Sequence, residues 1–244
     1  TEIYTLSLHD ALPILGLLGL LMAWSMLFAQ ISSLGFHGVT SRLFPYFRNR
    51  ENGHNGFLFI AFMVMSAGFI LFLLVFWPMK PWLVETNIEK SGLFTEYIGL
   101  LVPLTFFTML FVQLDYYNKV LYDAVFGTFL QEFLQRVLIL LMTLLFVFQV
   151  VTLHQFVWLY AASVCVKGVI IFIFLVIKGE INLRPNLRFI DSKLKKEMMD
   201  VALFNVLTGL GGSIIFNVDK IIVNQMLGLS ATGVYTIAFF FGTL

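Results

Sequence analysis

The sequence predicts an all-α fold, a polytopic bundle of about seven transmembrane helices. The first reason is composition: 59% of the 244 residues are hydrophobic and only 12% are charged, whereas soluble domains carry about 25% charged residues. A soluble fold of this composition would expose large apolar patches, which promote aggregation. The second reason is that the apolar residues occur in runs of about 20, the length that crosses a bilayer core as a helix.

Six complete runs and one partial run follow one another along the chain. They cover residues 14–34, 57–78, 97–114, 133–151, 155–177 and 199–218, the last extending to 227, and the partial run begins near Ala231. Transmembrane strands alternate between apolar and polar residues over about 10 positions. Because these runs stay apolar for much longer, we expect helices.

The loops between these runs differ in their content of Lys and Arg. The loops after the first, third and fifth runs, with the helix ends beside them, hold eleven basic residues, whereas the other loops hold only Lys80 and Lys90. Short loops rich in basic residues stay in the cytoplasm. We therefore expect the first set of loops, including residues 178–198, to be cytoplasmic.

Several classes of function are disfavoured. A formal net charge of +1 gives no reason to expect nucleic acid as a partner. The single cysteine, Cys165, and four scattered histidines show no metal-ligand spacing, so we expect no metal and no cofactor. There is also no serine elbow and no pair of carboxylates within a membrane run. We therefore expect no catalytic residues and no enzymatic activity.

Lys167 is the sharpest candidate for a functional residue. It lies near the middle of the fifth run, twelve residues from Gln155 and eleven from Lys178. A lysine at the centre of a membrane helix costs about 2.5–3.5 kcal/mol to insert, and eleven helical residues are too long a distance for comfortable snorkelling. The side chain should therefore face a wet cavity or an acidic partner in the bundle. Both remain open, and the cavity is favoured.

A polar group marks the start of the fourth run and contains Gln131, Glu132, Gln135 and Arg136. The two pairs four residues apart lie next to each other on a helix, and glutamate before arginine is the favourable order. The group is either a solvated helix foot at the cytoplasmic interface or a place where substrate enters. Both interpretations remain open, and Gln135 and Arg136 are included among the candidate pathway residues.

Two features predict places where helices bend. Pro103 removes a backbone hydrogen bond inside the third run and should kink it. Gly209, Gly211 and Gly212 form a loose point in the sixth run. Transporters that rock between states use such points, although glycine is also more frequent in membrane helices generally.

The chain divides into four expected segments. They are residues 1–14, an incomplete first bundle at 15–177, a linker at 178–198, and the start of a second bundle at 199–244. Residues 1–14 resemble a translated sequencing adapter, and their charges and Pro13 suit a membrane helix poorly, so we exclude them from the fold. The chain starts without Met and stops inside an apolar run, and we therefore expect a fragment.

The linker is rich in charge and is expected to contain a short amphipathic helix. Asp191 or Ser192 is in position to cap that helix, and apolar residues follow at helical spacing. An ordinary loop between two helices is the alternative. The length and charge of the linker favour a hinge between two bundles.

Three stretches carry a resemblance to a known family. They are residues 34–47, the basic linker, and residues 216–238 with Asp219, Gly233 and Tyr235. With the helices in place, they resemble the polysaccharide-unit flippases of the multidrug/oligosaccharidyl-lipid/polysaccharide exporter superfamily. The third stretch is the most specific, since it looks like the Asp-containing end of the family's seventh helix followed by the Gly-x-Tyr start of its eighth.

This resemblance implies a two-lobe, MATE-like fold of six helices a lobe around a central cavity. It implies that the parent protein flips an undecaprenyl-diphosphate-linked oligosaccharide across the bacterial inner membrane by alternating access, with the oligosaccharide and the bilayer as its partners. Lys167, Arg136 and Arg42 occupy matching positions for a cationic cavity. The chain departs from the family pattern by lacking the first helix and most of the second lobe.

Other functions remain as alternatives. A cation-coupled drug exporter of the same superfamily would need a carboxylate at mid-membrane in the first lobe, and the sequence places none there up to Ile177. A membrane enzyme of envelope synthesis would need a large outer loop, and the longest one, residues 79–96, is short. A structural or assembly subunit is the last alternative.

Overall fold

All regular secondary structure in the described part of the chain is helical. The computed structural model describes residues 8–186 and 189–242, and its elements are listed in chain order. They are α1 (Leu8–Ser32), α2 (Phe36–Phe47), η1 (Gly53–Gly56), α3 (Phe57–Asn87), α4 (Gly92–Tyr97), η2 (Ile98–Leu100), α5 (Leu101–Val120), α6 (Ala124–Phe129), η3 (Leu130–Leu134), α7 (Gln135–Val147), α8 (Leu153–Ile177), α9 (Ser192–Leu227) and α10 (Leu229–Gly242). The predicted all-α class is confirmed.

Six helical segments are long and apolar enough to cross a bilayer. They are Ala11–Ser32, Gly53–Asn87, Gly92–Val120, Ala124–Val147, Leu153–Ile177 and Ser192–Leu227. Each overlaps one of the six complete runs found in the sequence. The partial seventh run forms α10, which is apolar but has only 14 residues. The protein is therefore a multi-pass membrane protein.

Two helix boundaries differ most from the predicted ones. Helix α3 was expected to end at Pro78 but continues to Asn87, because membrane helices tolerate proline where neighbours or local adjustments satisfy the freed carbonyls. The fourth span was expected to start at Phe133 but starts at Ala124. There, the Asp123 side chain accepts a hydrogen bond from the Phe126 backbone N–H and caps the helix.

The predicted short linker helix is not a separate element. Asp191 does cap a helix, by accepting from the Leu194 backbone N–H at 2.7 Å, but that helix is α9 itself. At the other end of the chain, α1 begins at Leu8, so part of the segment at 1–14 that we excluded is helical. Its remaining residues, 1–7, lie outside the described residues.

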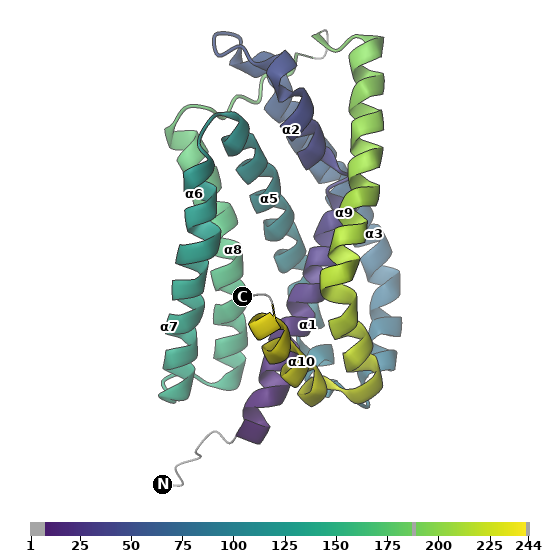
Figure 1. The fold of residues 1–244 in the computed structure, drawn as a ribbon, viewed down its shortest axis with the longest axis vertical. Coiled ribbons are helices and arrows are strands. Elements are labelled where there is room, and N and C mark those ends of the chain that lie inside the picture. Colours follow the sequence, from purple (N-terminus) through teal and green to yellow (C-terminus); the bar gives the residue numbers. More distant parts are fainter. Residues whose placement is uncertain (1–7, 187–188, 243–244) are drawn as a thin grey trace.

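Helix α1 is central in the bundle. It packs against α5 on one side and against α9 and α10 on the other. Helices α6, α7 and α8 lie together at one side of the view in Figure 1, α9 and α3 lie at the opposite side, and α2 lies beyond the end of α1. Two clusters of buried apolar side chains, one around Leu17 and Phe76 and one around Phe44 and Phe57, fill the interior.

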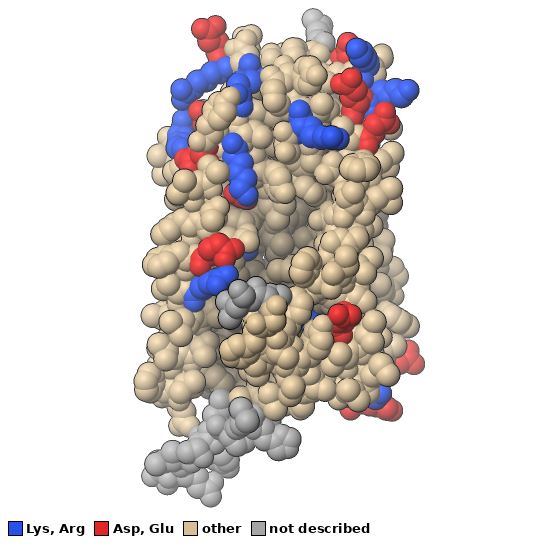
Figure 2. All heavy atoms as spheres, in the orientation of Figure 1, with Lys and Arg blue, Asp and Glu red and all other residues tan. Residues whose placement is uncertain are grey.

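The loops after α2, α5 and α8 meet at one end of the bundle, which we call the basic end and define by residues 48–56, 121–123, 178–186 and 189–191. Figure 2 shows Lys, Arg, Asp and Glu side chains gathered at this end. Arg48 joins two of the loops, because its guanidinium donates to the backbone oxygen of Val120. The three loops predicted to share one side of the membrane therefore lie together.

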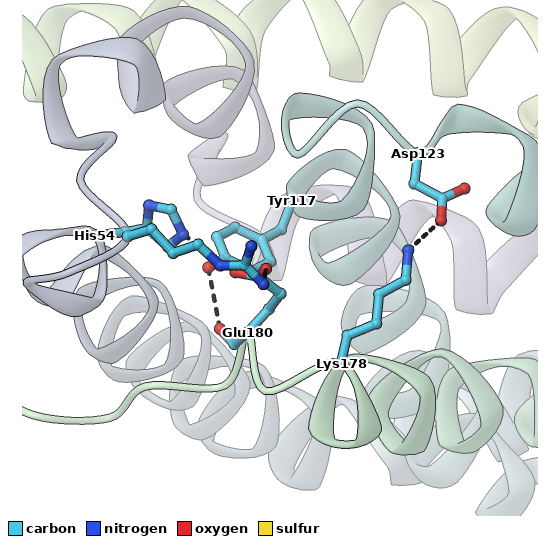
Figure 3. Close-up of polar contacts among 6 residues, drawn as sticks. His54, Tyr117, Asp123, Lys178 and Glu180 are labelled. Atoms are coloured by element: carbon cyan, nitrogen blue, oxygen red, sulfur yellow. Dashed lines mark hydrogen bonds and ion pairs between the residues drawn. The ribbon is translucent and has the colours of Figure 1, made fainter.

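Glu180 connects the chain after α8 to the loop after α2 (Figure 3). Its carboxylate lies 3.1 Å from Nη2 of Arg50 and 3.2 Å from Nε2 of His54. The Tyr117 hydroxyl of α5 donates to the backbone oxygen of Glu180 at 3.2 Å. His54 has a φ of 53°, in the left-handed region that few non-glycine residues adopt. These contacts fix the first residues of the linker to the helices that precede it.

A second ion pair joins Lys178, at the end of α8, to Asp123 in the loop before α6 (Figure 3). The hydrogen bond from Lys178 holds the pKa of Asp123 below its ordinary value, and the backbone N–H of Phe126 acts in the same direction, while burial opposes them. The pair is partly exposed. Its contribution to stability is therefore modest.

The turns at the opposite end of the bundle, which we call the far end, are residues 88–91, 148–152 and 228. Here the Lys90 ammonium donates to the backbone oxygens of Gln225 and Met226 at 3.1 and 3.2 Å. A cation in this position satisfies carbonyls that the end of α9 leaves free. The turn after α3 is thereby attached to the end of α9.

Candidate functional site

A cavity of about 1110 Å³ lies between the helices and is lined by residues of α1, α5, η3, α7, α8, α9 and α10. Figure 2 shows a hollow on this face, between α9 and the group formed by α6, α7 and α8. Most of its lining side chains are apolar, and its charged ones are Lys167, Glu132, Arg136 and Lys220. Few polar groups in a mostly apolar concave surface are typical of a ligand site.

Lys167 of α8 faces this cavity. Its side chain is only 6% exposed, its Nζ donates to Oε1 of Gln135 at 2.8 Å, and it lies 4.6 Å from the centre of the Phe111 ring. No ion pair among residues 8–186 and 189–242 includes it. Of the two environments that the sequence left open, the structure places Lys167 at a cavity, with a neutral amide and an aromatic ring as neighbours.

The polar group of the fourth span lies inside the helix and not at its foot. Because α6 starts at Ala124, Gln131 and Glu132 fall in η3, a π-helical turn, and line the cavity with Gln135 and Arg136. Glu132 and Arg136 form the predicted ion pair. π-Helical turns inside α-helices are frequent at functional sites, and this one, together with the first two residues of α7, presents four polar side chains to the cavity.

The position of Glu132 also alters one of our inferences. The sequence placed no carboxylate of the first lobe at mid-membrane, whereas the structure places Glu132 inside a span, as the ninth residue of Ala124–Val147. The error follows from the late start assigned to this span. Glu132 is therefore a carboxylate that a coupling cation could reach from the cavity.

Arg42 lies beside the main cavity. It is exposed on α2 and lines a second, smaller cavity of about 280 Å³ with Tyr116 of α5 and Asn205 of α9. His37 lines both cavities, so they adjoin. Of the four predicted pathway residues, the structure thus brings Lys167, Arg136 and Gln135 together and places Arg42 in the adjoining cavity.

Pro103 is the third residue of α5, immediately after the 3₁₀ turn η2. A proline cannot donate a hydrogen bond to the carbonyl four residues earlier, which is that of Gly99. The carbonyl of Gly99 therefore lacks its usual α-helical donor, and this carbonyl lies in the 3₁₀ turn η2. The carbonyl of Pro103 itself faces α8, 3.9 Å from Sγ of Cys165.

The three glycines of α9 differ in their surroundings. A Cβ on Gly209 would lie 2.0 Å from Nε2 of Gln30 in α1, so this glycine allows a close approach of the two helices. A Cβ on Gly211 or Gly212 would have no neighbour within 4 Å. Helix α9 is continuous through all three positions, and Gly212 lines the cavity.

Residues Asp219, Gly233 and Tyr235, which carried the family resemblance, lie on α9 and α10. The Tyr235 hydroxyl donates to Oδ2 of Asp219 at 2.9 Å, which joins the two helices. A Cβ on Gly233 would lie 2.1 Å from the backbone oxygen of Leu12. Glycine at this position therefore allows α10 to pack closely against α1.

Lys220 is the cavity residue that the sequence analysis missed. It is half-buried in α9, lines the cavity, and lies 4.8 Å from the centre of the Phe239 ring. No ion pair among the described residues includes it. A signal was available, since Lys220 follows Asp219 in a long apolar helix, but we considered only Asp219. The cavity thus has lysines on α8 and α9, helices on different sides of it.

The arrangement is suited to binding. Within the ranges 8–186 and 189–242, no group of three His, Cys, Asp or Glu side chains is placed to hold a metal ion. The cavity instead offers ammonium groups next to aromatic rings, amides, and a large apolar surface. These groups can hold an amphipathic ligand with negative charge.

Taken together, the fold and cavity define a polytopic helical membrane protein with an internal cavity. A family model described as polysaccharide biosynthesis protein matches residues 15–244. The chain therefore belongs to the polysaccharide biosynthesis protein family, as the resemblance of residues 216–238 indicated. No curated protein and no solved structure matches the chain.

Proposed function

We propose that this chain is part of a transporter, and not an enzyme, that flips a lipid-linked oligosaccharide across the bacterial inner membrane by alternating access. The observation that carries the proposal is the cavity of about 1110 Å³, in which Lys167 faces open space without an acidic partner among the described residues. Membership in the polysaccharide biosynthesis family supports the class of substrate.

The chemistry of the cavity suits both parts of such a substrate. Sugars and phosphates bring hydroxyl and anionic oxygens that can accept from Lys167, Lys220 and Arg136, and aromatic rings beside two of these cations allow each to remain desolvated until a ligand arrives. The apolar lining suits a polyprenyl chain. An undecaprenyl diphosphate carrier combines these features.

The distribution of charge supports an orientation. The loops at the basic end, together with the helix ends beside them, contain most of the basic residues of the chain, and such loops remain in the cytoplasm. We place the basic end, with the linker at 178–198, in the cytoplasm. The far end then faces the outside of the inner membrane.

The experiment is transport by the protein expressed from the complete reading frame and reconstituted in liposomes with a lipid-linked oligosaccharide. Flipping is measured as the rate at which the sugar becomes accessible to a glycosidase on the opposite side. Lys167→Gln should lower the rate by at least about tenfold, because one charge-assisted contact is worth about 1.5–3 kcal/mol. Lys193→Gln, an exposed lysine at the start of α9, is the matched control and should transport normally.

A wild-type protein that leaves the sugar on its original side would contradict the proposed function. Recovery of the reading frame provides an independent test, since neighbouring glycosyltransferase genes are expected for a flippase of polysaccharide units. If transport requires a second protein in the liposomes, a role as an assembly subunit would be favoured.

A second candidate is cation-coupled export, which the position of Glu132 in the cavity favours. Its ion pair with Arg136 argues against a freely titrating carboxylate. Glu132→Gln distinguishes the two functions. A coupled exporter should lose its response to a proton or sodium gradient, whereas an uncoupled flippase should transport at the same rate with and without the gradient.

A further inference from the structure

Three buried polar side chains are hydrogen-bonded to one another at the far end of the bundle. Nδ2 of Asn224 donates to Oδ1 of Asn87 at 2.7 Å, and the Ser91 hydroxyl donates to Oδ1 of Asn224 at 2.6 Å. Asn87 is 3% exposed, and Ser91 and Asn224 are each 1% exposed. We call these three residues the far-end cluster. Asn224 uses both ends of its amide, so its side chain is held in one orientation.

The far-end cluster joins parts of the chain that are distant in sequence. Asn87 ends α3 and Ser91 precedes α4, whereas Asn224 lies in the last turn of α9, 133 residues after Ser91. In the proposed two-lobe architecture, α3 and α4 belong to the first lobe and α9 belongs to the second. The cluster is therefore a contact between lobes on the side of the membrane where the substrate would leave.

A close helix contact continues this seam between the proposed lobes. A Cβ on Gly16 of α1 would lie 2.0 Å from the backbone oxygen of Leu229 in α10, and one on Gly19 would lie 2.6 Å from Oγ1 of Thr236. Small residues of this kind allow membrane helices to approach closely. The seam between α1, α3 and α4 on one side and α9 and α10 on the other is therefore closed in this structure.

The chemistry of the cluster suits a contact that opens. Purely apolar packing would be sufficient for a permanent brace and would avoid the cost of desolvating amides. Amides and hydroxyls, by contrast, can exchange their partners for water when they separate, and the cluster lies at the end of the bundle, where Lys90 and Glu89 are exposed. Its groups thus have hydrogen-bond partners in both the closed and the open state.

We propose that Asn87, Ser91 and Asn224 form the gate at the far end, which is closed in this structure and must separate for substrate to leave the cavity. This inference rests on the proposed function, because it assigns the direction of release. It also makes a claim about the protein itself, that the cavity becomes accessible from the far end when these hydrogen bonds are broken.

Cross-linking tests the gate directly. In the protein from the complete reading frame, with Cys165→Ala to remove the free thiol, the pair Ser91→Cys and Asn224→Cys is oxidised to a disulfide. Transport should fall by at least about tenfold and should recover after reduction, since a locked gate blocks every turnover. The two single-cysteine variants, treated with the same oxidant, control for the substitutions. A cross-linked protein that transports as fast as the same protein after reduction of the disulfide would overturn the proposal.

Accessibility tests the gate without a disulfide. A cysteine at Ser213, which lines the cavity, is labelled with a membrane-impermeant maleimide added at the far-end side. Asn224→Asp removes the amide donor to Asn87 and should raise the labelling rate about tenfold, the shift expected from the loss of weak membrane hydrogen bonds. Asn52→Asp makes the same change at an exposed residue of the basic end and should leave the labelling rate unchanged.

The two readouts separate the inference from the proposed function. If the wild type does not transport but Asn224→Asp raises labelling, the gate is supported and the assigned substrate is wrong. If the wild type transports, and neither the disulfide nor Asn224→Asp has an effect, the far-end cluster is a static brace. If the cysteines fail to cross-link, the labelling result decides alone.

Discussion

The close contact between α1 and α10 makes a prediction that can be worked out from the structure. A Cβ on Gly16 would lie 2.0 Å from the backbone oxygen of Leu229, and real Cβ atoms essentially never approach closer than 3.0 Å. Gly16→Ala therefore requires the two helices to separate by about 1 Å. Overpacking of this kind costs about 1–3 kcal/mol, and backbone atoms cannot move aside as a flexible side chain can.

Two effects of the substitution oppose each other. Alanine stabilises a helix by about 1 kcal/mol relative to glycine, so the net destabilisation for Gly16→Ala should be about 0–2 kcal/mol. Gly211→Ala is the matched control, because its added Cβ has no neighbour within 4 Å. This variant should keep the full gain of about 1 kcal/mol.

Thermal unfolding of the purified protein in detergent or nanodiscs measures both effects. For a chain of this size, 1 kcal/mol shifts Tm by about 2–4 °C. We therefore expect Gly16→Ala to lower Tm by up to about 8 °C and Gly211→Ala to raise it by about 2–4 °C. Shifts in the same direction would contradict the assignment of Gly16 to a tight helix contact.

Three further predictions concern polar contacts. Asp123 contributes stability that is present above its unfolded pKa, about 3.9, and is lost as the pH falls through its lower folded pKa. The Tm of Asp123→Asn should therefore fall less on acidification than the Tm of the wild type. Identical dependence of Tm on pH in the two proteins would argue against the ion pair with Lys178. Gln135→Leu leaves the Lys167 ammonium without its hydrogen-bond acceptor and should cost about 1–3 kcal/mol in chemical or thermal unfolding; an unchanged stability would mean that solvent replaces the amide. Glu180→Ala should increase limited proteolysis in the linker, since it removes the carboxylate that pairs with two basic side chains. A variant that is cleaved at the same rate as the wild type would contradict this prediction.

The sequence was informative wherever one residue's burial cost determines its surroundings. Lys167 could be predicted to face a cavity or a partner because a charge at mid-membrane is expensive. The start of the fourth span at Ala124 was missed because residues 124–132 are less apolar than the rest, although Asp123 is a good capping residue. Hydrophobicity identified the helix, whereas the residue at which the helix begins depends on its cap, which we did not use.

The far-end cluster illustrates what could not be predicted. Asn87 and Asn224 are separated by 137 residues, and nothing in the local sequence of either one indicates the other. An asparagine in a membrane helix indicates, by itself, only that its amide forms a hydrogen bond with some other group. The same limit applied to Lys220, whose orientation toward the cavity depends on how α9 packs against α1. Contacts between distant helices follow from packing, which local patterns do not determine.

The length of α9 connects the gate to the predicted loose point at its glycines. A rigid α9 that moved outward at Asn224 would tilt and press inward at its other end. There, the carbonyl oxygen of Ala202 already lies 2.2 Å from the position of a Cβ on Gly35, so no space remains for movement toward α2. The far end can therefore open only if α9 bends between these contacts, and Gly211 and Gly212 lie between them with open space around both.

Stiffening α9 at Gly211 and Gly212 should change stability and transport in opposite directions. We expect the double variant Gly211→Ala and Gly212→Ala to raise Tm, because each alanine favours the helix by about 1 kcal/mol. Its transport rate should fall, because bending a helix without glycine is harder. The two measurements on the same sample check this, with Gly99→Ala as a glycine control outside α9, where an added Cβ has no neighbour within 4 Å. A variant that is more stable and transports as fast as the wild type would show that the gate opens without a bend in α9.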